Sequence, residues 1–182
     1  MNIERKYDII YMDPPWRYAR DAKSSSGGET FAIEDQYPTM SLEELKQLDV
    51  KSLANKDCII YMWVTNPKLD WGIELGKHWG FDFKTVAFVW EKQGPLQGHY
   101  TMGETEQVLV FKRKGGKIPQ PRGARNVRQF LSERKRQHSR KPDEIRRRIE
   151  EMHPTQSKLE MFARTAPEGW DVWGNETNKF TQ

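Results

Sequence analysis

The tetrapeptide Asp13-Pro14-Pro15-Trp16 has the residue types best suited to catalysis in this chain. It follows an apolar run, residues 7–12, that predicts a buried parallel strand, and proline cannot continue the hydrogen bonding of a strand. Ligands of open α/β sheets bind beyond the carboxyl ends of the strands, so the tetrapeptide is expected in the ligand crevice. Two successive prolines fix the backbone and remove two N–H donors, which leaves hydrogen-bond acceptors.

Acceptors of this kind suit an amine that is conjugated to an aromatic ring, whose delocalised lone pair makes it a poor nucleophile. The Asp13 carboxylate and a proline carbonyl could each accept one amine hydrogen and stabilise the charge that develops as the nitrogen attacks a sulfonium methyl group. Trp16 would stack on the base, which is worth about 1–3 kcal/mol against the cost of extruding that base from a duplex. The alternative is a tight structural turn with Trp16 in the core.

Basic residues are concentrated between Lys112 and Arg148. This segment holds 15 Lys and Arg but three Asp and Glu, a net charge of +12, whereas the whole chain carries +4. Such a run can be a solvated loop, but its place between apolar segments favours a phosphate-binding surface. Nucleic acid is therefore the expected partner, with a basic loop or insert at about 112–140.

Alternating strand-like and helix-like segments predict one α/β domain over residues 1–182 with a largely parallel sheet. The expected strands cover residues 7–12, 58–64, 85–90, 107–111 and 171–174. Helices are expected after the capping box of Ser41 and Glu44, after Pro67, after Pro142, and over residues 157–164.

The remaining composition excludes several classes. The single cysteine, Cys58, excludes an intramolecular disulfide, and no histidine or cysteine spacing indicates a zinc site, so no metal is expected. No apolar run approaches membrane-spanning length, and the polar start lacks the apolar core of a signal peptide. We expect no membrane partner and a cytoplasmic location.

Six motifs occur in an order that resembles the family named after the AdoMet-binding subunit of the eukaryotic mRNA adenosine methyltransferase. They are Asp13-Pro14-Pro15-Trp16, Tyr37-Pro38-Thr39-Met40-Ser41, Trp63-Val64-Thr65, Gly98-His99-Tyr100, Lys141-Pro142-Asp143-Glu144 and Gly174-Asn175-Glu176. The resemblance covers nearly the whole chain. It is strongest to compact members from bacteria and phages, which are associated with adenine methylation in DNA.

The resemblance implies a permuted Rossmann-like, AdoMet-dependent methyltransferase, with the catalytic motif before the AdoMet motif and helices on both faces of the sheet. The implied catalytic residues are Asp13, Pro14, Pro15 and Trp16. The implied cofactor-binding residues are Asp13, Lys141, Glu160, Phe162, Arg164, Asn175 and Glu176. The expected substrate-binding residues are Tyr37, His99, Arg134, Lys135, Arg136 and Arg140.

Several alternatives stay open. Lys141 could contact phosphate, Glu160 and Arg164 could form an ion pair within a helix, and Asn175 could be a turn residue. DNA is favoured over RNA, but an RNA adenosine methyltransferase and a catalytically silent, nucleic-acid-binding partner subunit are both alternatives. A small-molecule amine methyltransferase and a basic structural protein fit the charge or the double-proline turn less well. A homodimer is plausible.

Overall fold

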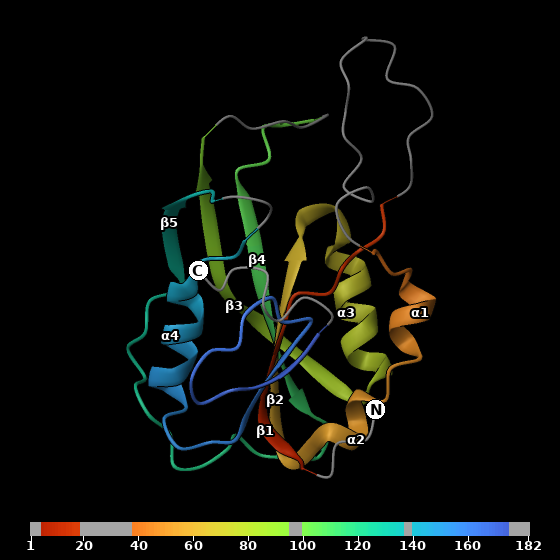
Figure 1. The fold of residues 1–182 in the computed structure, drawn as a ribbon, viewed down its shortest axis with the longest axis vertical. Helices are drawn as coiled ribbons and strands as arrows, with labels where there is room; N and C mark the ends of the chain where they lie inside the picture. Colours follow the sequence, from red (N-terminus) through yellow and green to blue (C-terminus); the bar gives the residue numbers. More distant parts are fainter. Residues whose placement is uncertain (1–4, 19–37, 95–99, 137–139, 175–182) are drawn as a thin grey trace.

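The computed structural model describes residues 5–18, 38–94, 100–136 and 140–174. These residues form a seven-stranded sheet in the order β5-β3-β4-β2-β1-β6-β7, with helices on both faces (Figure 1). The strands are β1 (Tyr7–Met12), β2 (Ala54–Thr65), β3 (Phe81–Gln93), β4 (Thr105–Arg113), β5 (Phe130–Arg134), β6 (Lys158–Met161) and β7 (Asp171–Trp173). The helices are α1 (Leu42–Lys46), α2 (Val50–Leu53), α3 (Leu69–His78) and α4 (Asp143–Met152), with a 3-10 turn, η2 (Asn66–Lys68), before α3.

The centre of the sheet is parallel, as the sequence predicts. β1 pairs in parallel with β2 on one side and with β6 on the other, and β6 pairs in parallel with β7. β4 runs antiparallel to both β2 and β3, and β5 is parallel to β3. The carboxyl ends of β1, β2, β6 and β7 therefore meet at one edge of the sheet, the edge at which ligands bind in such folds.

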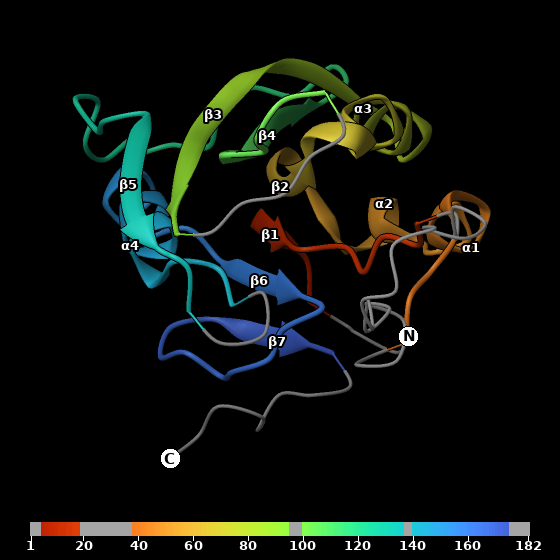
Figure 2. The ribbon, with the colours of Figure 1, turned by 90° about the horizontal axis from the view of Figure 1, so that it is seen from above.

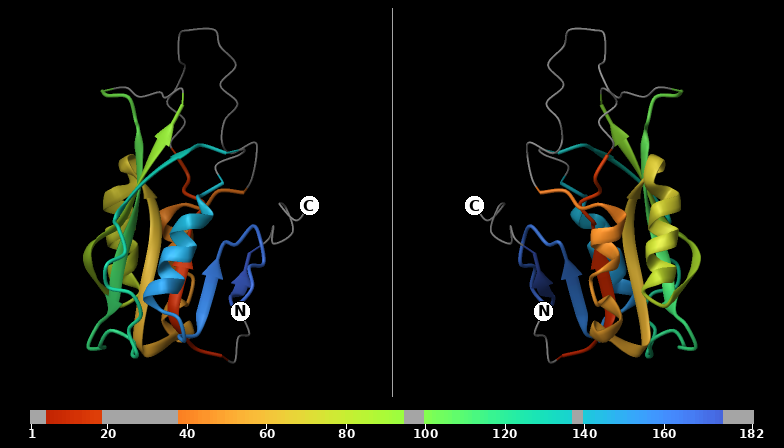
Figure 3. Two further views of the ribbon diagram at one scale, coloured as in Figure 1. Left: turned by 90° about the vertical axis from the view of Figure 1, so that its left-hand side faces the viewer. Right: turned by 90° about the vertical axis from the view of Figure 1, so that its right-hand side faces the viewer.

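Two hydrophobic cores cover the two faces of the sheet, and β2 contributes to both. Its side chains alternate between faces, as they do in any strand. Ile60 and Met62 pack in the core under α1–α3, whereas Ile59 and Trp63 pack in the core under α4 with Ile145. Figure 2 shows the sheet curling round α4, and Figure 3 shows α3 on the opposite side. The expected Rossmann-like arrangement is confirmed.

Helix α3 packs closely against the sheet because it turns glycine toward it. A Cβ atom at Gly72 would lie 2.5 Å from Val64 Cγ1, and one at Gly76 would lie 2.3 Å from the Phe111 ring. Neither position can hold a larger residue unless the helix shifts. This contact fixes the position of α3 on the sheet.

The helix starts predicted at Ser41 and at Pro142 are present. The Ser41 hydroxyl accepts from the Glu44 N–H, and the Glu44 side chain accepts from the Ser41 N–H, which completes the capping box of α1. Pro142 is the N-cap residue of α4, and Asp143 and Glu144 occupy its first turn, where carboxylates interact favourably with the helix dipole.

Two features of the C-terminal half differ from the prediction. The helix expected over residues 157–164 is wrong, because Lys158–Met161 form the strand β6 between β1 and β7. Four residues carry too little pattern to separate a buried strand from a helix, and pairing with β1 decides the outcome. The basic segment, expected to be a loop or insert, contains the strand β5.

No helix among the described residues is long and apolar enough to cross a membrane.

Candidate active site

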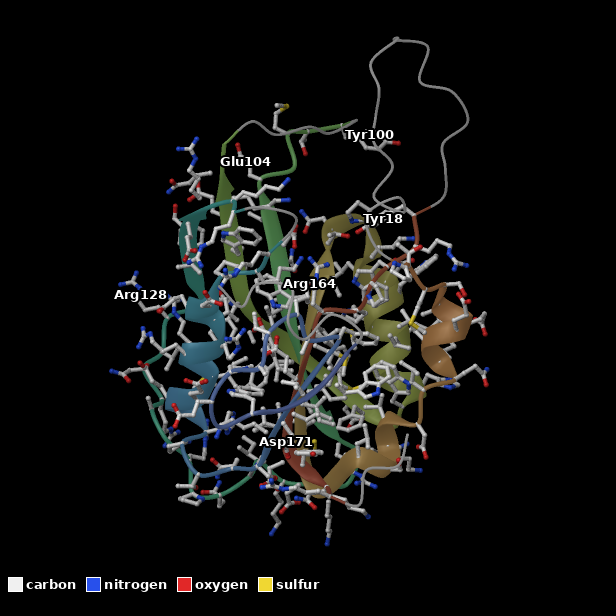
Figure 4. All side chains as sticks on the ribbon, in the orientation of Figure 1. Tyr18, Tyr100, Glu104, Arg128, Arg164 and Asp171 are labelled. Carbon is white, nitrogen blue, oxygen red and sulfur yellow. The ribbon has the colours of Figure 1, made fainter. Side chains whose placement is uncertain are left out.

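Asp13 follows β1 directly and lines three neighbouring cavities at the carboxyl edge of the sheet. The first cavity has a volume of about 350 Å³ and is bounded by residues that follow β6 and β7. The second, about 370 Å³, lies beside the end of β2 and the start of β4. The third is small and lies against the start of α4. Arg164, labelled near the middle of the molecule in Figure 4, lines all three cavities with Asp13.

An ion-paired lysine holds the Asp13 carboxylate. Lys141 Nζ lies 3.4 Å from Asp13 Oδ2 and 2.8 Å from Glu106 Oε2, and these three side chains are 15%, 29% and 12% exposed, respectively. Burial raises the pKa of Asp13 and Glu106 raises it further, whereas Lys141 and Arg164 lower it. Burial also opposes ionisation of Glu106, but Lys141 and Lys92 hold its pKa below the usual value. Lys141 therefore favours the ionised form of both carboxyl groups.

The double-proline turn is fixed by backbone hydrogen bonds. The Pro14 carbonyl accepts from the Trp16 N–H at 2.9 Å, and the Pro15 carbonyl accepts from the Met40 N–H at 2.7 Å. Each carbonyl oxygen keeps a second lone pair that could accept from a ligand. Pro14 and Pro15 line the 370 Å³ cavity together with Asp13, and the acceptor role of their carbonyls stays a prediction.

Trp16 contributes to the core as well as to the cavity. Its side chain lines the 370 Å³ cavity, but it is only 5% exposed, and its indole N–H donates to the Trp63 carbonyl at 3.3 Å. Little of the ring is free to stack on a base in this conformation. The alternative that places Trp16 in the core describes its packing better.

Tyr18 is an aromatic residue of the same cavity that the sequence analysis did not single out. It is partly buried, and its hydroxyl lies 2.6 Å from Thr65 Oγ1, while Lys68 Nζ lies 5.2 Å from its ring centroid. The available signal was its spacing, because residues two apart, such as Trp16 and Tyr18, lie on the same side of an extended chain.

Glu160 is the buried carboxylate of the small cavity. It lies on β6 opposite Tyr11 of β1, and its Oε2 accepts from Arg146 Nε at 3.0 Å. Burial raises the pKa of Glu160 to about 7, although Arg146 opposes this rise. The proposed ion pair within a helix between Glu160 and Arg164 is wrong, because Glu160 lies on a strand and pairs with Arg146.

The chain turns sharply after β6 and comes close to the end of β7. Phe162 has a φ of +60°, in the left-handed region that residues other than glycine rarely adopt, and its ring packs edge-on against Trp173 at 5.2 Å. A Cβ atom at Gly174 would lie 2.6 Å from the Ala163 carbonyl oxygen. Such conformations are held by surrounding structure and cluster at ligand sites. Phe162, Trp173 and Gly174 line the 350 Å³ cavity.

The four basic substrate-binding candidates fall into two pairs. Arg134 and Lys135 are exposed and have no ion-pair partner among the described residues, and Lys135 lines the 370 Å³ cavity. Arg136 pairs with Glu133 at 2.7 Å and with Asp143 at 2.9 Å, and Arg140 also pairs with Asp143. The first pair is therefore the better placed for phosphate.

Much of the remaining charge between Lys112 and Arg148 serves the fold. Arg113 donates to the carbonyls of Ala54 and Asn55, and Arg148 pairs with Glu144 at 2.9 Å. The +12 of the segment thus overstates the charge that a ligand would meet.

Four candidates, Tyr37, His99, Asn175 and Glu176, lie outside the described residues. No group of three or more His, Cys, Asp or Glu that could hold a metal ion occurs within the described ranges. Glu106 and Arg146 are site residues that the sequence analysis missed. The one available signal for Glu106 was an acidic residue at the start of an apolar strand.

Comparison with known proteins adds independent information. The MT-A70 family model matches residues 7–176. The chain is 47% identical to the type II methyltransferase M.MunI of a Mycoplasma species, over 94% of this chain and 78% of that protein. It is 31% identical to an N(6)-adenosine-methyltransferase MT-A70-like protein of Arabidopsis thaliana, over 98% of this chain but 25% of that protein. It is 27% identical to the N(6)-adenine-specific methyltransferase METTL4 of Mus musculus, over 99% of this chain and 39% of that protein.

Proposed function

This chain belongs to the MT-A70 family, and from that premise we propose that it transfers the methyl group of S-adenosylmethionine to the N6 amine of adenine in DNA. The observation that carries the proposal is the position of Asp13, an ion-paired carboxylate at the junction of two cavities of about 350 and 370 Å³. A methyl transfer needs one compartment for the donor, one for the acceptor, and a polar group between them.

The 370 Å³ cavity is the proposed adenine site. Its lining includes Asp13, Pro14, Pro15 and Tyr18. An aromatic face beside the base contributes about 1–3 kcal/mol, which would offset part of the cost of extruding the adenine. Tyr18 replaces Trp16 as the proposed stacking residue, since Trp16 is packed into the core.

The residues around the 350 Å³ cavity and the small cavity fit S-adenosylmethionine, whose sulfonium group supplies an electrophilic methyl. Phe162 and Trp173 give apolar walls, and the Gly174 backbone leaves no room for a side chain against Ala163. Glu160 can accept from both ribose hydroxyls when it is ionised. Lys141 and Arg164 border the same space, and Asn175 and Glu176 stay proposed cofactor residues from the family resemblance.

Asp13 would accept one N6 hydrogen and a proline carbonyl the other, which orients the nitrogen lone pair toward the methyl carbon. Bound S-adenosylmethionine would supply an electrophilic methyl group, which N6 would take as the carbon–sulfur bond breaks and leaves its electron pair on sulfur. Asp13 would then pass the N6 proton to solvent. Lys141 favours the ionised form of Asp13 beforehand and opposes the effect of burial, because its ammonium group lies 3.4 Å from the carboxylate.

DNA is the proposed substrate because M.MunI is named a type II methyltransferase and aligns with 94% of this chain. RNA is the second candidate, since the plant relative is named an adenosine methyltransferase, but this chain spans only a quarter of its length. Arg134 and Lys135 are the proposed phosphate contacts of either substrate, and a homodimer remains a prediction.

The experiment that tests the proposal measures methyl transfer from labelled S-adenosylmethionine to single-stranded DNA, duplex DNA and RNA, followed by nucleoside analysis. We expect N6-methyladenine in DNA. D13N should lower the rate at saturating donor about a hundred- to a thousandfold and leave the unfolding transition in place. D70N is the matched control, because Asp70 is exposed on α3 and lines none of the three cavities.

Transfer to cytosine, or to RNA alone, would contradict the DNA adenine assignment. A D13N rate close to that of D70N would show that Asp13 takes no part in methyl transfer, whatever the substrate.

The phosphate contacts are tested by salt dependence. Neutralising Arg134 and Lys135 together should reduce the slope of log K against log salt by about two, since each phosphate contact contributes about 0.9 on duplex DNA. The control replaces Lys51 and Lys77, which are exposed on α2 and α3. An unchanged slope in the variant that lacks both Arg134 and Lys135 would show that the end of β5 does not contact DNA phosphates.

A further inference from the structure

A fourth cavity, separate from the three around Asp13, lies on the α4 face of the sheet. Its volume is about 620 Å³, and it shares no lining residue with the other three. Its floor is formed by β2, β3 and β4, and its sides by the segment between β4 and β5 and the end of α4. In Figure 1 that segment passes round the lower, left-hand side of α4.

The cavity has an apolar interior. Ile59, Val86, Phe88 and Val110 come from the three strands, and Met152 comes from the last turn of α4. Pockets that bind small molecules typically have volumes of about 300–1,000 Å³ and apolar linings with few polar groups. This cavity has that size and that lining, and the proposed methyl transfer uses none of its residues.

Tyr61 and His153, two buried polar residues, are among those that line this cavity. The Tyr61 hydroxyl lies 2.9 Å from His153 Nε2, and both side chains are 2% exposed. His153 Nδ1 has no hydrogen-bond partner among the described residues. Burial, with Lys158 and Arg122, lowers the pKa of His153 to about 4, so the ring is neutral at physiological pH. When Tyr61 donates to Nε2, the hydrogen is on Nδ1, and a buried donor is left without an acceptor.

The charges around the cavity are all positive. Lys84, Lys112, Lys117 and Arg122 line it, and no acidic residue does so within the described ranges. Lys112 is engaged with the Gly116 carbonyl and Lys84 lies 3.7 Å from Asp82, so Arg122 and Lys117 are the better placed to meet an anion. Burial raises the pKa of Tyr61, and the nearby Arg122 opposes this rise. Arg122 also adds to the lowering of the His153 pKa that burial causes.

We propose that this cavity is a second ligand site, which binds a small amphipathic anion: an aromatic or alkyl body with one carboxylate. The apolar walls would hold the body. The carboxylate would accept from Arg122, with Lys117 as a second cation of the lining.

The test uses 2-naphthoate as the probe, with 2-naphthalenemethanol and 2-naphthylmethylammonium as neutral and cationic analogues of the same shape. Binding is followed by the NMR signals of ¹³C-methyl methionine in the whole chain. Met152 lines the cavity, and its signal is assigned with M152L. We expect 2-naphthoate to shift the Met152 signal, the alcohol to bind about tenfold more weakly, and the ammonium compound to bind least.

Two variants locate the site. A87W should block binding, because Ala87 lines the cavity and an indole ring would fill it. R122Q should weaken binding of 2-naphthoate about tenfold and leave binding of the alcohol unchanged. R125Q is the matched control, since Arg125 is exposed in the same segment and does not line the cavity. Arg122 is an exposed side chain, so R122Q tests the proposal even if A87W does not fold.

Three results would overturn the proposal. The first is no Met152 shift at millimolar 2-naphthoate, and the second is equal binding of all three probes. The third is a dimer that dissociates on dilution, is lost in A87W and competes with 2-naphthoate, because the occupant would then be a second copy of the chain. None of these readouts depends on methyl transfer.

Discussion

Replacing Lys141 with methionine should destabilise the fold by an amount that depends on pH. At an effective dielectric constant of 20, the attraction of Lys141 to Glu106 across 2.8 Å is worth about 6 kcal/mol and that to Asp13 across 3.4 Å about 5 kcal/mol. Desolvation of the ammonium group offsets much of this sum. Removal of one partner from a buried ion pair typically costs 3–5 kcal/mol. Glu106 keeps Lys92 at 3.3 Å, so we expect about 3 kcal/mol at pH 8.

The loss should shrink in acid. Burial already raises the pKa of Asp13 in the wild type, and removal of Lys141 should raise it further. The pKa of Glu106, which Lys141 helps to hold low, should also rise, so that both folded-state values lie above those of the unfolded chain, which are about 4. The folded variant then binds more protons than the unfolded chain, so its stability relative to the wild type recovers as the pH falls through the raised values. Urea unfolding at pH 8 and at pH 5.5 measures both free energies.

Two further variants make this measurement specific. E106Q in the K141M background removes one of the stranded carboxylates and should recover part of the loss. K92M removes the other lysine from Glu106 and leaves the Lys141 bridge intact, so it should cost less than half as much as K141M. A K141M loss below about 1 kcal/mol at pH 8, or an equal loss at both pH values, would refute the view that Lys141 neutralises two buried carboxylates.

Three other predictions address the cofactor site and the fold. Binding of S-adenosylmethionine should strengthen as the pH rises through about 7, because Glu160 ionises there and then accepts hydroxyl hydrogens; calorimetry should find no such rise in E160Q. G76A should cost about 1–3 kcal/mol in unfolding experiments, since its methyl group would overlap the Phe111 ring, and an unchanged melting temperature would show that α3 moves freely. S41A should cost about 1 kcal/mol through loss of the capping box, and a neutral result would mean that α1 is held by packing alone.

The parts of the fold that the sequence predicts are those whose burial is continuous or strictly periodic. Strand β1 is buried on both faces, so its run of apolar residues predicts a buried parallel strand. Helix α4 buries Ile145 and Ile149, which are four residues apart, and has acidic residues in its first turn. In both elements the local pattern and the tertiary environment favour the same structure.

Strand β6 shows where local pattern fails. Lys158–Met161 are good helix formers, and intrinsic propensity differs by less than about 1 kcal/mol per residue between such types. All four residues pair with β1, and Leu159, Glu160 and Met161 also pair with β7, which outweighs that preference. A partner 149 residues away, in the contact of Asp8 with Ser157, leaves no signal in a local window.

The candidate site also has one part that local sequence predicts and one part that only the fold reveals. The acceptor-only turn is a property of four consecutive residues and is visible in the sequence. The charges that tune it come from pairs that the sheet brings together, Glu106 with Lys141 and Arg146 with Glu160. Neither pair could be inferred from spacing, because Glu160 was expected on a helix and Glu106 is far from Lys141 in the sequence.

Summing charge over the basic segment treats every cation as equally available, and the structure shows why this overestimates the DNA-binding surface. A guanidinium that donates to backbone carbonyls, as that of Arg113 does, or that is paired with a carboxylate, as that of Arg148 is, must lose those contacts before it can bind phosphate. A cation without a partner in the fold loses only water. Phosphate should therefore be drawn to Arg134 and Lys135 at the end of β5, and Lys135 borders the cavity in which Asp13 would receive the extruded adenine.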